Sequence, residues 1–296
     1  MQFAGIFWAK ERGLYEARGL DVNVVAWTGG DRSVIELVQG AAANGELCAG
    51  CVEDNLVVRS FATDGSVRVF GAMLQETPMV LMSRPNKRIR AIADLRGKRV
   101  GMHTDGIRLL EMILALEDIP ADDLDLVEVG FDLEHLQQDR LDAMQGYAMT
   151  EPIQLESMGV DVDVLQVRHR RLNPYAQSYF SQSALLDDHR DRFSDFLAAS
   201  SEGWFAVCAE PDEAVEVVSR VRRGQTHERV ERVAHRRSLD RLIPLISGRF
   251  GVERIGSIDY EQWQRNLDTY FEFGLTPRRL AVRDLVAAIE SGREIV

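Results

Sequence analysis

The stretch Lys98-Arg99-Val100-Gly101-Met102-His103 and the residues behind it decide the fold that the sequence predicts. The stretch itself is typical of a short strand, and residues 106–117 predict a helix. Residues 124–129 favour a strand again. A strand, a helix and a second strand in this order imply a βαβ unit with parallel strands. The chain is therefore expected to be an α/β protein.

The same alternation extends outward from this unit in both directions. Pro78 interrupts it, and it restarts behind that residue. From about residue 185 the pattern is nearly all helical, so the C-terminal third is expected to be helical. The expected strands are 20–27, 67–74, 79–83, 98–103, 124–129, 141–147 and 162–167. The expected helices are 4–18, 34–39, 55–61, 106–117, 133–138, 151–158, 190–209, 211–222, 230–246, 260–271 and 282–289.

Composition places the chain among ordinary globular proteins. It has 296 residues, of which 45% are hydrophobic and 28% charged, enough for one large core or two smaller ones. Its net charge of -12 argues against a nucleic-acid partner and against an acidic membrane surface. No apolar run is long enough to span a membrane. The opening residues 1–8 lack the basic start of a signal peptide, so the chain either starts there naturally or lacks a leader and a first strand.

Catalytic motifs do not stand out. Neither a glycine-rich phosphate or dinucleotide loop nor a Gly-x-Ser-x-Gly elbow is present in the sequence. Three cysteines are too few for a disulfide framework. Cys48 and Cys51 form a CxxC pair, for which packing at a strand end is favoured over zinc or redox chemistry. No catalytic residue, metal or cofactor is therefore expected.

The loops behind the strands carry the side chains of most interest. Ligands of open α/β sheets bind outside the carboxyl ends of strands. Four such loops are 27–30, 53–55, 103–106 and 147–152, and their side chains are acidic or aromatic rather than basic. This favours a cationic, amino or amide-rich ring ligand over an anion. Helix capping is the alternative role for Asp54, Asp105 and Glu151, and the two roles can coexist.

Several short motifs, in order, resemble those of one known family. They are Phe3-Ala4-Gly5-Ile6 with residues 9–15 and 19–22, Glu53-Asp54-Asn55, Gln75-Glu76-Thr77-Pro78, residues 94–101, Leu141-Asp142-Ala143, Glu151-Pro152 and Gly203-Trp204. Together they resemble the thiamine-pyrimidine-synthase-like periplasmic binding proteins, which are related to the aliphatic sulfonate binding proteins of ABC importers. The resemblance covers about residues 3–211.

This resemblance implies a type 2 periplasmic-binding-protein fold with two lobes and a helical C-terminal third. One lobe would hold residues 1–78 plus 181–296, and the other residues 79–180. Two crossings, near 75–83 and 175–180, would form the hinge. The family's first strand, which precedes the Phe3 position, is missing here. The cysteine-dense motif of the pyrimidine synthases is missing too, which argues against synthase activity.

The implied function is reversible capture of a small molecule between two lobes, without chemical change. By analogy the ligand would be a pyrimidine precursor of thiamine or another aromatic heterocycle. The partner would be an ABC transporter permease and the location periplasmic or otherwise extracytoplasmic, with a cytoplasmic location left open. A ligand-sensing domain and a pyrimidine-synthase-like enzyme are the alternatives. The candidate ligand-binding residues are the aromatic Phe3, Trp27, Tyr147 and Tyr175 and the polar Glu53, Asp54, Gln75, His103 and Glu151.

Overall fold

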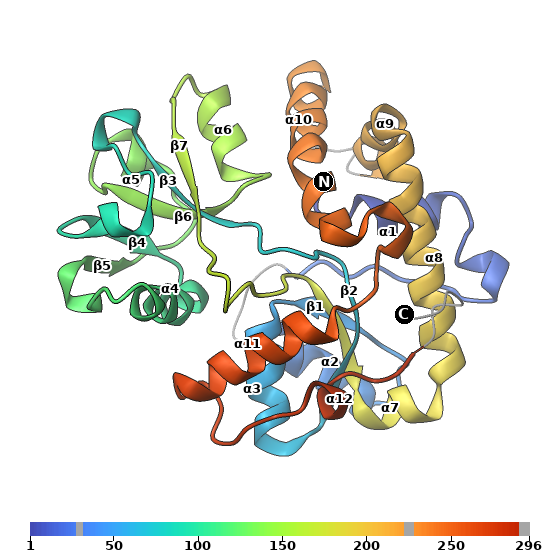
Figure 1. The fold of residues 1–296 in the computed structure, drawn as a ribbon. Helices are drawn as coiled ribbons and strands as arrows, with labels where there is room; N and C mark the ends of the chain where they lie inside the picture. Colours follow the sequence, from blue (N-terminus) through green and yellow to red (C-terminus); the bar gives the residue numbers. More distant parts are fainter. Residues whose placement is uncertain (28–31, 222–227, 290–296) are drawn as a thin grey trace. The chain divides into compact units, whose positions relative to one another are not determined.

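The computed structural model describes residues 1–27, 32–221 and 228–289, and it divides into two compact units (Figure 1). Unit 1 comprises Met1–Glu76, Asn173–Thr226 and Ile243–Val296. Unit 2 comprises Thr77–Leu172 and His227–Leu242. Each unit has its own β-sheet, as the restart of the alternation behind Pro78 predicts. Each unit combines a β-sheet with helices, so the chain is an α/β protein, as expected.

The sheet of unit 1 has the order β1-β8-β2. Its strands are β1 (Gly50–Val52), β8 (Ser178–Gln182) and β2 (Val67–Ala72). Central β8 is antiparallel to both neighbours, and its Tyr179 lies opposite Cys51 of β1. The helices of this unit are α1 (Ala4–Glu11), α2 (Val34–Ala43), α3 (Asp54–Asp64), α7 (Ser183–Asp188), α8 (Arg190–Ala209), α9 (Pro211–Val221), α11 (Tyr260–Glu272) and α12 (Val282–Leu285), with short 3-10 turns at Glu16–Arg18, Gly248–Phe250 and Val252–Arg254.

Two glycines allow α1 and α8 to pack closely in unit 1. A Cβ at Gly203 of α8 would lie 2.2 Å from the carbonyl oxygen of Gly5 in α1. A Cβ at Gly5 would lie 2.3 Å from the ring of Trp204. Trp204 is buried as a result and fills the space beside α1. The Gly203-Trp204 motif is therefore explained by helix packing.

The sheet of unit 2 has the order β5-β4-β6-β3-β7. Strand β4 (Arg99–Met102) is parallel to β5 (Asp125–Glu128) and to β6 (Ala143–Tyr147). Strand β3 (Met79–Ser83) is antiparallel to β6 and to β7 (Asp163–Gln166). The central βαβ unit thus forms as predicted. The helices are α4 (Thr104–Leu116), α5 (Glu134–Gln137) and α6 (Glu151–Ser157), with short 3-10 turns at Pro85–Lys87, Ile92–Leu95 and Ala121–Asp123.

The core of unit 2 lies between this sheet and its covering elements. Apolar side chains of β3 and β6 meet those of α5 and α6, which explains why alternate strand residues are large and apolar. Leu155 of α6 and Leu136 of α5 are fully buried there. The buried residues of this core are Val80, Met82, Leu133, Leu136, Leu141, Met144 and Leu155.

Helix α10 (Glu228–Ser247) divides between the units, which differs from the expected grouping of residues 181–296. The hydroxyl of Ser238 donates to the carbonyl of Met149 at 2.7 Å. Arg241 donates to the carbonyl of Ala148 and, at 2.8 Å, to the carboxylate of Glu156. These bonds join the first part of α10 to unit 2. The helical pattern of this segment could not reveal them, since it indicates only that a helix forms.

The segment 20–27, expected as a strand, is not part of a sheet in the structure. Residues 23–27 are exposed, Val25 at 80% and Trp27 at 54%. A strand needs a neighbour for its backbone groups, and no ladder to this segment occurs within the described residues. Residues 28–30 of the following loop, and Arg222 at the end of an expected helix, lie outside the described residues.

Two further expectations are corrected in unit 1. The helix expected at 282–289 ends at Leu285, because the next residues pair with β2: Val286 bridges Val69, and Ala287 donates to the carbonyl of Val69 at 2.8 Å. The sheet of unit 1 also consists of antiparallel pairs, although mainly parallel sheets were expected. The reason is β8, which returns from the second crossing and enters the sheet between two strands of the N-terminal segment.

Candidate functional site

The nine candidate residues fall into separate groups within the two units. His103, Tyr147 and Glu151 belong to unit 2, and the other six belong to unit 1. In unit 2 they share one edge of the sheet. Because β4, β5 and β6 are parallel, their carboxyl ends lie at the same edge. We call this edge, with His103, Glu128, Phe131, Gln145, Tyr147 and Glu151, the strand-end site.

Glu151 is held in place by the backbone of the preceding turn. Its Oε2 accepts a hydrogen bond of 2.6 Å from the backbone N–H of Tyr147. Glu151 is the first residue of α6, where a negative charge also interacts favourably with the helix dipole. The side chain is half-buried. The geometry therefore gives the carboxylate a local role at the start of the helix, while its contact with a ligand stays a prediction.

Gln145 connects β6 to the start of α4. Its Oε1 accepts a hydrogen bond of 3.0 Å from the backbone N–H of His103, and its side chain is buried. A Cβ at position 106 would lie 2.1 Å from that oxygen, which explains the glycine in the first turn of α4. Gln145 is not among the nine candidate residues. A polar residue inside an otherwise apolar strand was the available signal.

His103 also lies against Phe131, which is not among the nine candidate residues. The two ring centroids are 4.4 Å apart, and the ring planes are tilted by 60°. Beside them, the Thr104 hydroxyl donates to Glu128 at 2.6 Å. Phe131 follows β5 and His103 follows β4, so strand pairing brings them together. The position of Phe131 behind a strand was the only sequence signal for it.

Asp54 in unit 1 has an internal network of partners. The hydroxyl of Tyr270 donates to its Oδ1 at 2.7 Å, and the backbone N–H of Tyr175 donates to its Oδ2 at 3.0 Å. The amide of Asn266 adds a bond of 3.2 Å. Burial raises the pKa of Asp54 to about 7, although these hydrogen bonds act in the opposite direction. The side chain is fully buried, so its surroundings support a structural role.

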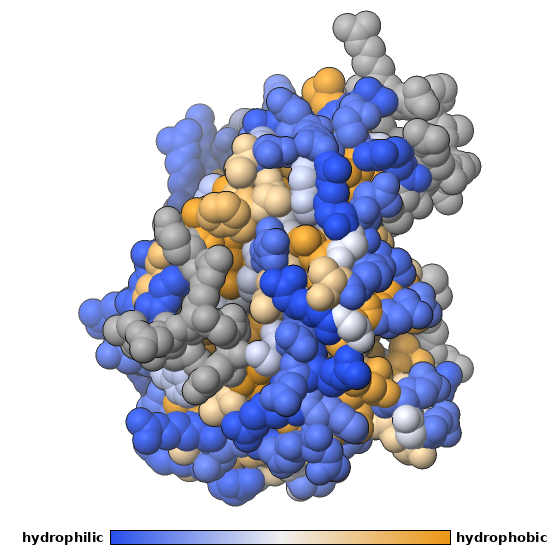
Figure 2. Space-filling model, turned by 90° about the vertical axis from the view of Figure 1, so that its right-hand side faces the viewer, coloured by the Kyte–Doolittle hydropathy of each residue, from blue (hydrophilic) through white to orange (hydrophobic). Residues whose placement is uncertain are grey.

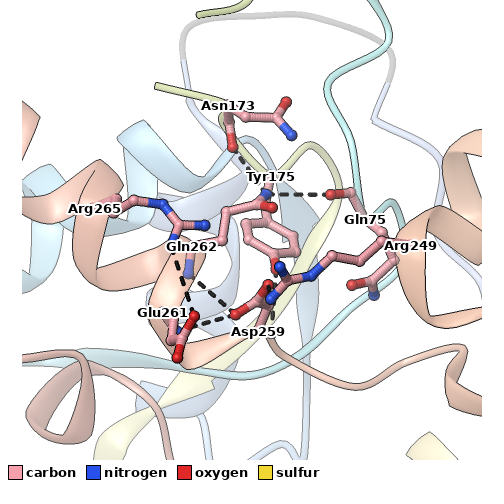
Figure 3. Close-up of polar contacts among 8 residues, drawn as sticks. All are labelled: Gln75, Asn173, Tyr175, Arg249, Asp259, Glu261, Gln262 and Arg265. Atoms are coloured by element: carbon pink, nitrogen blue, oxygen red, sulfur yellow. Dashed lines mark hydrogen bonds and ion pairs between the residues drawn. The ribbon is translucent and has the colours of Figure 1, made fainter. Parts of the chain in front are cut away.

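Gln75 and Tyr175 belong to a second polar network of unit 1 (Figure 3). The side-chain amide of Gln262 donates to the carbonyl of Gln75 at 3.3 Å and to that of Asn173 at 3.1 Å. Gln75 and Asn173 lie where the two crossings leave unit 1, so one side chain joins both. The Tyr175 hydroxyl accepts from the backbone N–H of Asp259 at 3.2 Å.

Buried surroundings also limit what Gln75 and Tyr175 can contact. The side-chain amide of Gln75 donates to the carbonyl of Ser257 at 2.9 Å, and only 5% of the residue is exposed. The ring of Tyr175 is fully buried and stacks on Trp263, with centroids 5.4 Å apart. Burial raises the pKa of Tyr175. Their predicted ligand contacts stay predictions, and the contacts that exist stabilise unit 1.

The remaining candidates are Glu53, Phe3 and Trp27. Glu53 precedes α3 and accepts a long hydrogen bond of 3.5 Å from the amide of Gln177. Phe3 caps the start of α1 through its backbone carbonyl, and Trp27 donates from its indole to the carbonyl of Arg32 at 3.2 Å. These contacts of Phe3 and Trp27 involve none of the other candidates.

Metal and disulfide chemistry find little support in the described ranges 1–27, 32–221 and 228–289. No group there brings together three or more His, Cys, Asp or Glu side chains in a way that could hold a metal ion. The three cysteines are free thiols, and burial raises the pKa of Cys51 well above its usual value. A thiol of this kind is a poor nucleophile and metal ligand, which supports the packing role expected for Cys51. No helix of the described residues is both long and apolar enough to cross a membrane.

Comparison with proteins of known sequence and structure gives consistent relatives. The riboflavin-binding protein RibY of Chloroflexus aurantiacus is 25% identical over 221 residues, which cover 73% of this chain and 62% of RibY. The chain thus spans less than two thirds of that relative's length. The periplasmic aliphatic sulphonate binding protein SsuA of Escherichia coli superposes with a TM-score of 0.74 at 17% identity, covering 97% of this chain and 94% of SsuA.

An enzyme also shares the fold. The desulfurization enzyme DSZB superposes with a TM-score of 0.64 at 14% identity, covering 96% of this chain and 93% of DSZB. At such identities the two structures show the fold alone. The sequence model of the family described as NMT1/THI5 like matches residues 1–214, most of the chain. The chain therefore belongs to the NMT1/THI5-like family.

Proposed function

We propose that this protein is a solute-binding protein that captures a small heterocyclic molecule for import by an ABC transporter. The observation that carries the proposal is the strand-end site of unit 2. There, side chains with aromatic rings, a carboxylate and an imidazole gather at the carboxyl ends of three parallel strands. Such an edge is where open α/β sheets bind their ligands. Membership of the family and the fold shared with SsuA support the same function.

The chemistry of the site favours a ring ligand that is neutral or cationic. Aromatic side chains offer flat apolar surfaces for stacking. Glu128 and Glu151 contribute negative charge to the same edge, and the whole chain carries a net charge of -12. An anionic solute would be repelled by these groups. A ring with an amino or ring N–H group could donate to them instead.

Two ligands follow from the relatives. The first is the aminopyrimidine precursor of thiamine, which the sequence resemblance implies. The second is riboflavin, which is favoured by the relative named as a riboflavin-binding protein. Both are flat nitrogen heterocycles with hydrogen-bonding groups at their edges, so both fit the same chemistry.

Calorimetric titration of each compound into the wild type and into Glu151→Gln tests the role of the site. Glutamine can still accept the hydrogen bond from the backbone N–H of Tyr147, so the variant loses charge but keeps the local structure. We expect at least fivefold weaker binding, because a charge-assisted bond to the ligand is lost. Glu117→Gln, at the opposite end of α4 from His103, is the matched control. Equal affinity of wild type and Glu151→Gln would refute the assigned role.

Binding without chemical change is a separate part of the proposal, since DSZB shows that an enzyme can have this fold. The protein is incubated with the compound for a prolonged time. The ligand is then extracted, and its molecular mass is measured by mass spectrometry. We expect the starting compound alone. A new product that depends on the protein would place the chain among the enzymes.

The proposed partner is a transporter permease, and the proposed location is outside the cytoplasm. Fractionation of the source cells tests this part, with recovery in the extracytoplasmic fraction expected. Recovery in the cytoplasm, together with ligand binding, would favour the alternative of a sensory domain.

A further inference from the structure

Phe131 is a large apolar side chain that remains in water. It is 74% exposed, and it follows β5 at the strand-end site. Most exposed apolar residues of a protein need no explanation. Phe131, however, lies beside polar side chains that converge on one edge, and its ring already contacts that of His103, with the two ring planes tilted by 60°. The exposed part of the ring beside this contact is available to a flat partner.

The second unusual side chain at this site is the imidazole of His103. Its Nε2 is buried and has no hydrogen-bond partner among the residues that the structure describes. A buried polar atom without a partner destabilises the folded state. His103 also precedes α4 without capping it through its side chain in this part of the chain. The local backbone therefore gives no reason for an imidazole at this position.

We propose that Phe131 and His103 together form the contact surface for the ring of the ligand, a planar heteroaromatic molecule. This inference rests on the proposed function and names two residues that carry it. A flat ring stacked on Phe131 covers the exposed phenyl group. An amino, carbonyl or ring-nitrogen group at its edge supplies the missing partner of His103 Nε2. One ligand molecule thus covers the exposed phenyl ring and also gives the Nε2 atom a hydrogen-bond partner.

Two hydrogen bonds hold the turn that carries the imidazole of His103. The backbone N–H of His103 is already bonded to Gln145, and the Thr104 hydroxyl to Glu128. These bonds fix the turn at the start of α4, and neither involves the imidazole ring. A neutral imidazole can donate or accept through Nε2, depending on its tautomer. Recognition by this pair therefore depends on the flatness of the ring and on a polar group at its edge.

The first experiment titrates riboflavin, by its fluorescence, and the aminopyrimidine precursor of thiamine, by calorimetry. The proteins are wild type, Phe131→Ala and Phe131→Leu. We expect about tenfold weaker binding for Phe131→Ala, the size of effect that loss of stacking and apolar contact produces. Phe131→Leu, which keeps apolar contact but lacks a ring, should lie between. Phe205→Ala, at another exposed phenylalanine on α8, is the control and should bind like wild type.

The second experiment measures both stability and binding of His103→Leu. We expect weaker binding, together with a Tm of the ligand-free variant equal to or above that of wild type, because an unpartnered polar atom has been replaced by an apolar group. A histidine with a purely structural role would instead lower the Tm on replacement.

The outcomes separate the two proposals. If wild type binds neither compound, the proposed ligand class fails and this inference fails with it. If wild type binds one of them and both Phe131 variants bind equally well, the inference alone is overturned. A Tm loss in His103→Leu without a change in affinity would also overturn it.

Discussion

A carboxylate follows a strand in both units, and its surroundings differ. In unit 1, Asp54 follows β1 and is fully buried, with hydrogen bonds from Tyr270, Asn266 and Tyr175. In unit 2, Glu151 follows β6, is half-buried and accepts a hydrogen bond from the backbone N–H of Tyr147. Position behind a strand therefore identifies a candidate residue, and the partners around it decide between a structural and a binding role.

The largest effect is expected for Asp54→Ala. Removing the carboxylate leaves the donors of Tyr270, Tyr175 and Asn266 buried without their acceptor, which costs about 3–5 kcal/mol of unfolding free energy. Glu151→Ala should cost about 1 kcal/mol or less, since one half-buried bond is lost. Urea midpoints of both variants, with exposed Asp188→Ala as a control, measure the difference. Equal losses for Asp54→Ala and Glu151→Ala would contradict the distinction drawn between the two carboxylates.

Stability should also depend on pH through Asp54. Its folded-state pKa of about 7 lies above its usual value of 3.8, so between these values the folded state holds more protons than the unfolded state. The resulting stabilisation is fully present below the lower value and is lost as pH rises through about 7. We expect this part of the unfolding free energy to fall by a few kcal/mol between those limits.

Asp54→Asn tests this dependence, because its amide does not titrate. The urea midpoint of the variant should change less between acidic and neutral pH than that of wild type. The same pH dependence in both proteins would show that other groups cause it.

A smaller effect than that of Asp54→Ala is expected for Gly106→Ala at the strand-end site. The added Cβ would lie 2.1 Å from Oε1 of Gln145, so the amide must move and its bond to the backbone N–H of His103 is lost. The cost should be about 1 kcal/mol of stability, with a further loss of ligand affinity. Gly130→Ala is the matched control, since a Cβ there meets no atom within 4 Å. Calorimetry and urea unfolding measure both quantities, and identical behaviour of the two variants would contradict the role of Gln145.

The sequence predicted the elements of unit 2 well, because each carries its own pattern. The β4-α4-β5 unit and β6 form where the alternation of strands and helices predicts them. The residues 20–27 have an equally good strand pattern but lack a neighbouring strand within the described residues. A strand forms only where a neighbouring strand pairs with its backbone groups. The residue pattern alone therefore could not predict the structure of this segment.

The candidate site was predictable only in part. His103, Tyr147 and Glu151 were found because they follow strands. The contact between His103 and Phe131 depends on the pairing of β4 with β5, which the sequence does not state. The burial of Asp54 depends on Tyr270, which lies more than 200 positions further along the chain.

The order of strands in unit 1 has a consequence for how the chain is made. Its middle strand, β8, is Ser178–Gln182, whereas the strands on either side, β1 and β2, end before residue 73. During synthesis, the ribosome therefore delivers every strand of the other sheet, from Met79 to Gln166, before the first sheet can close. The sheet of unit 1, whose first strand is synthesised first, is thus completed after the sheet of unit 2.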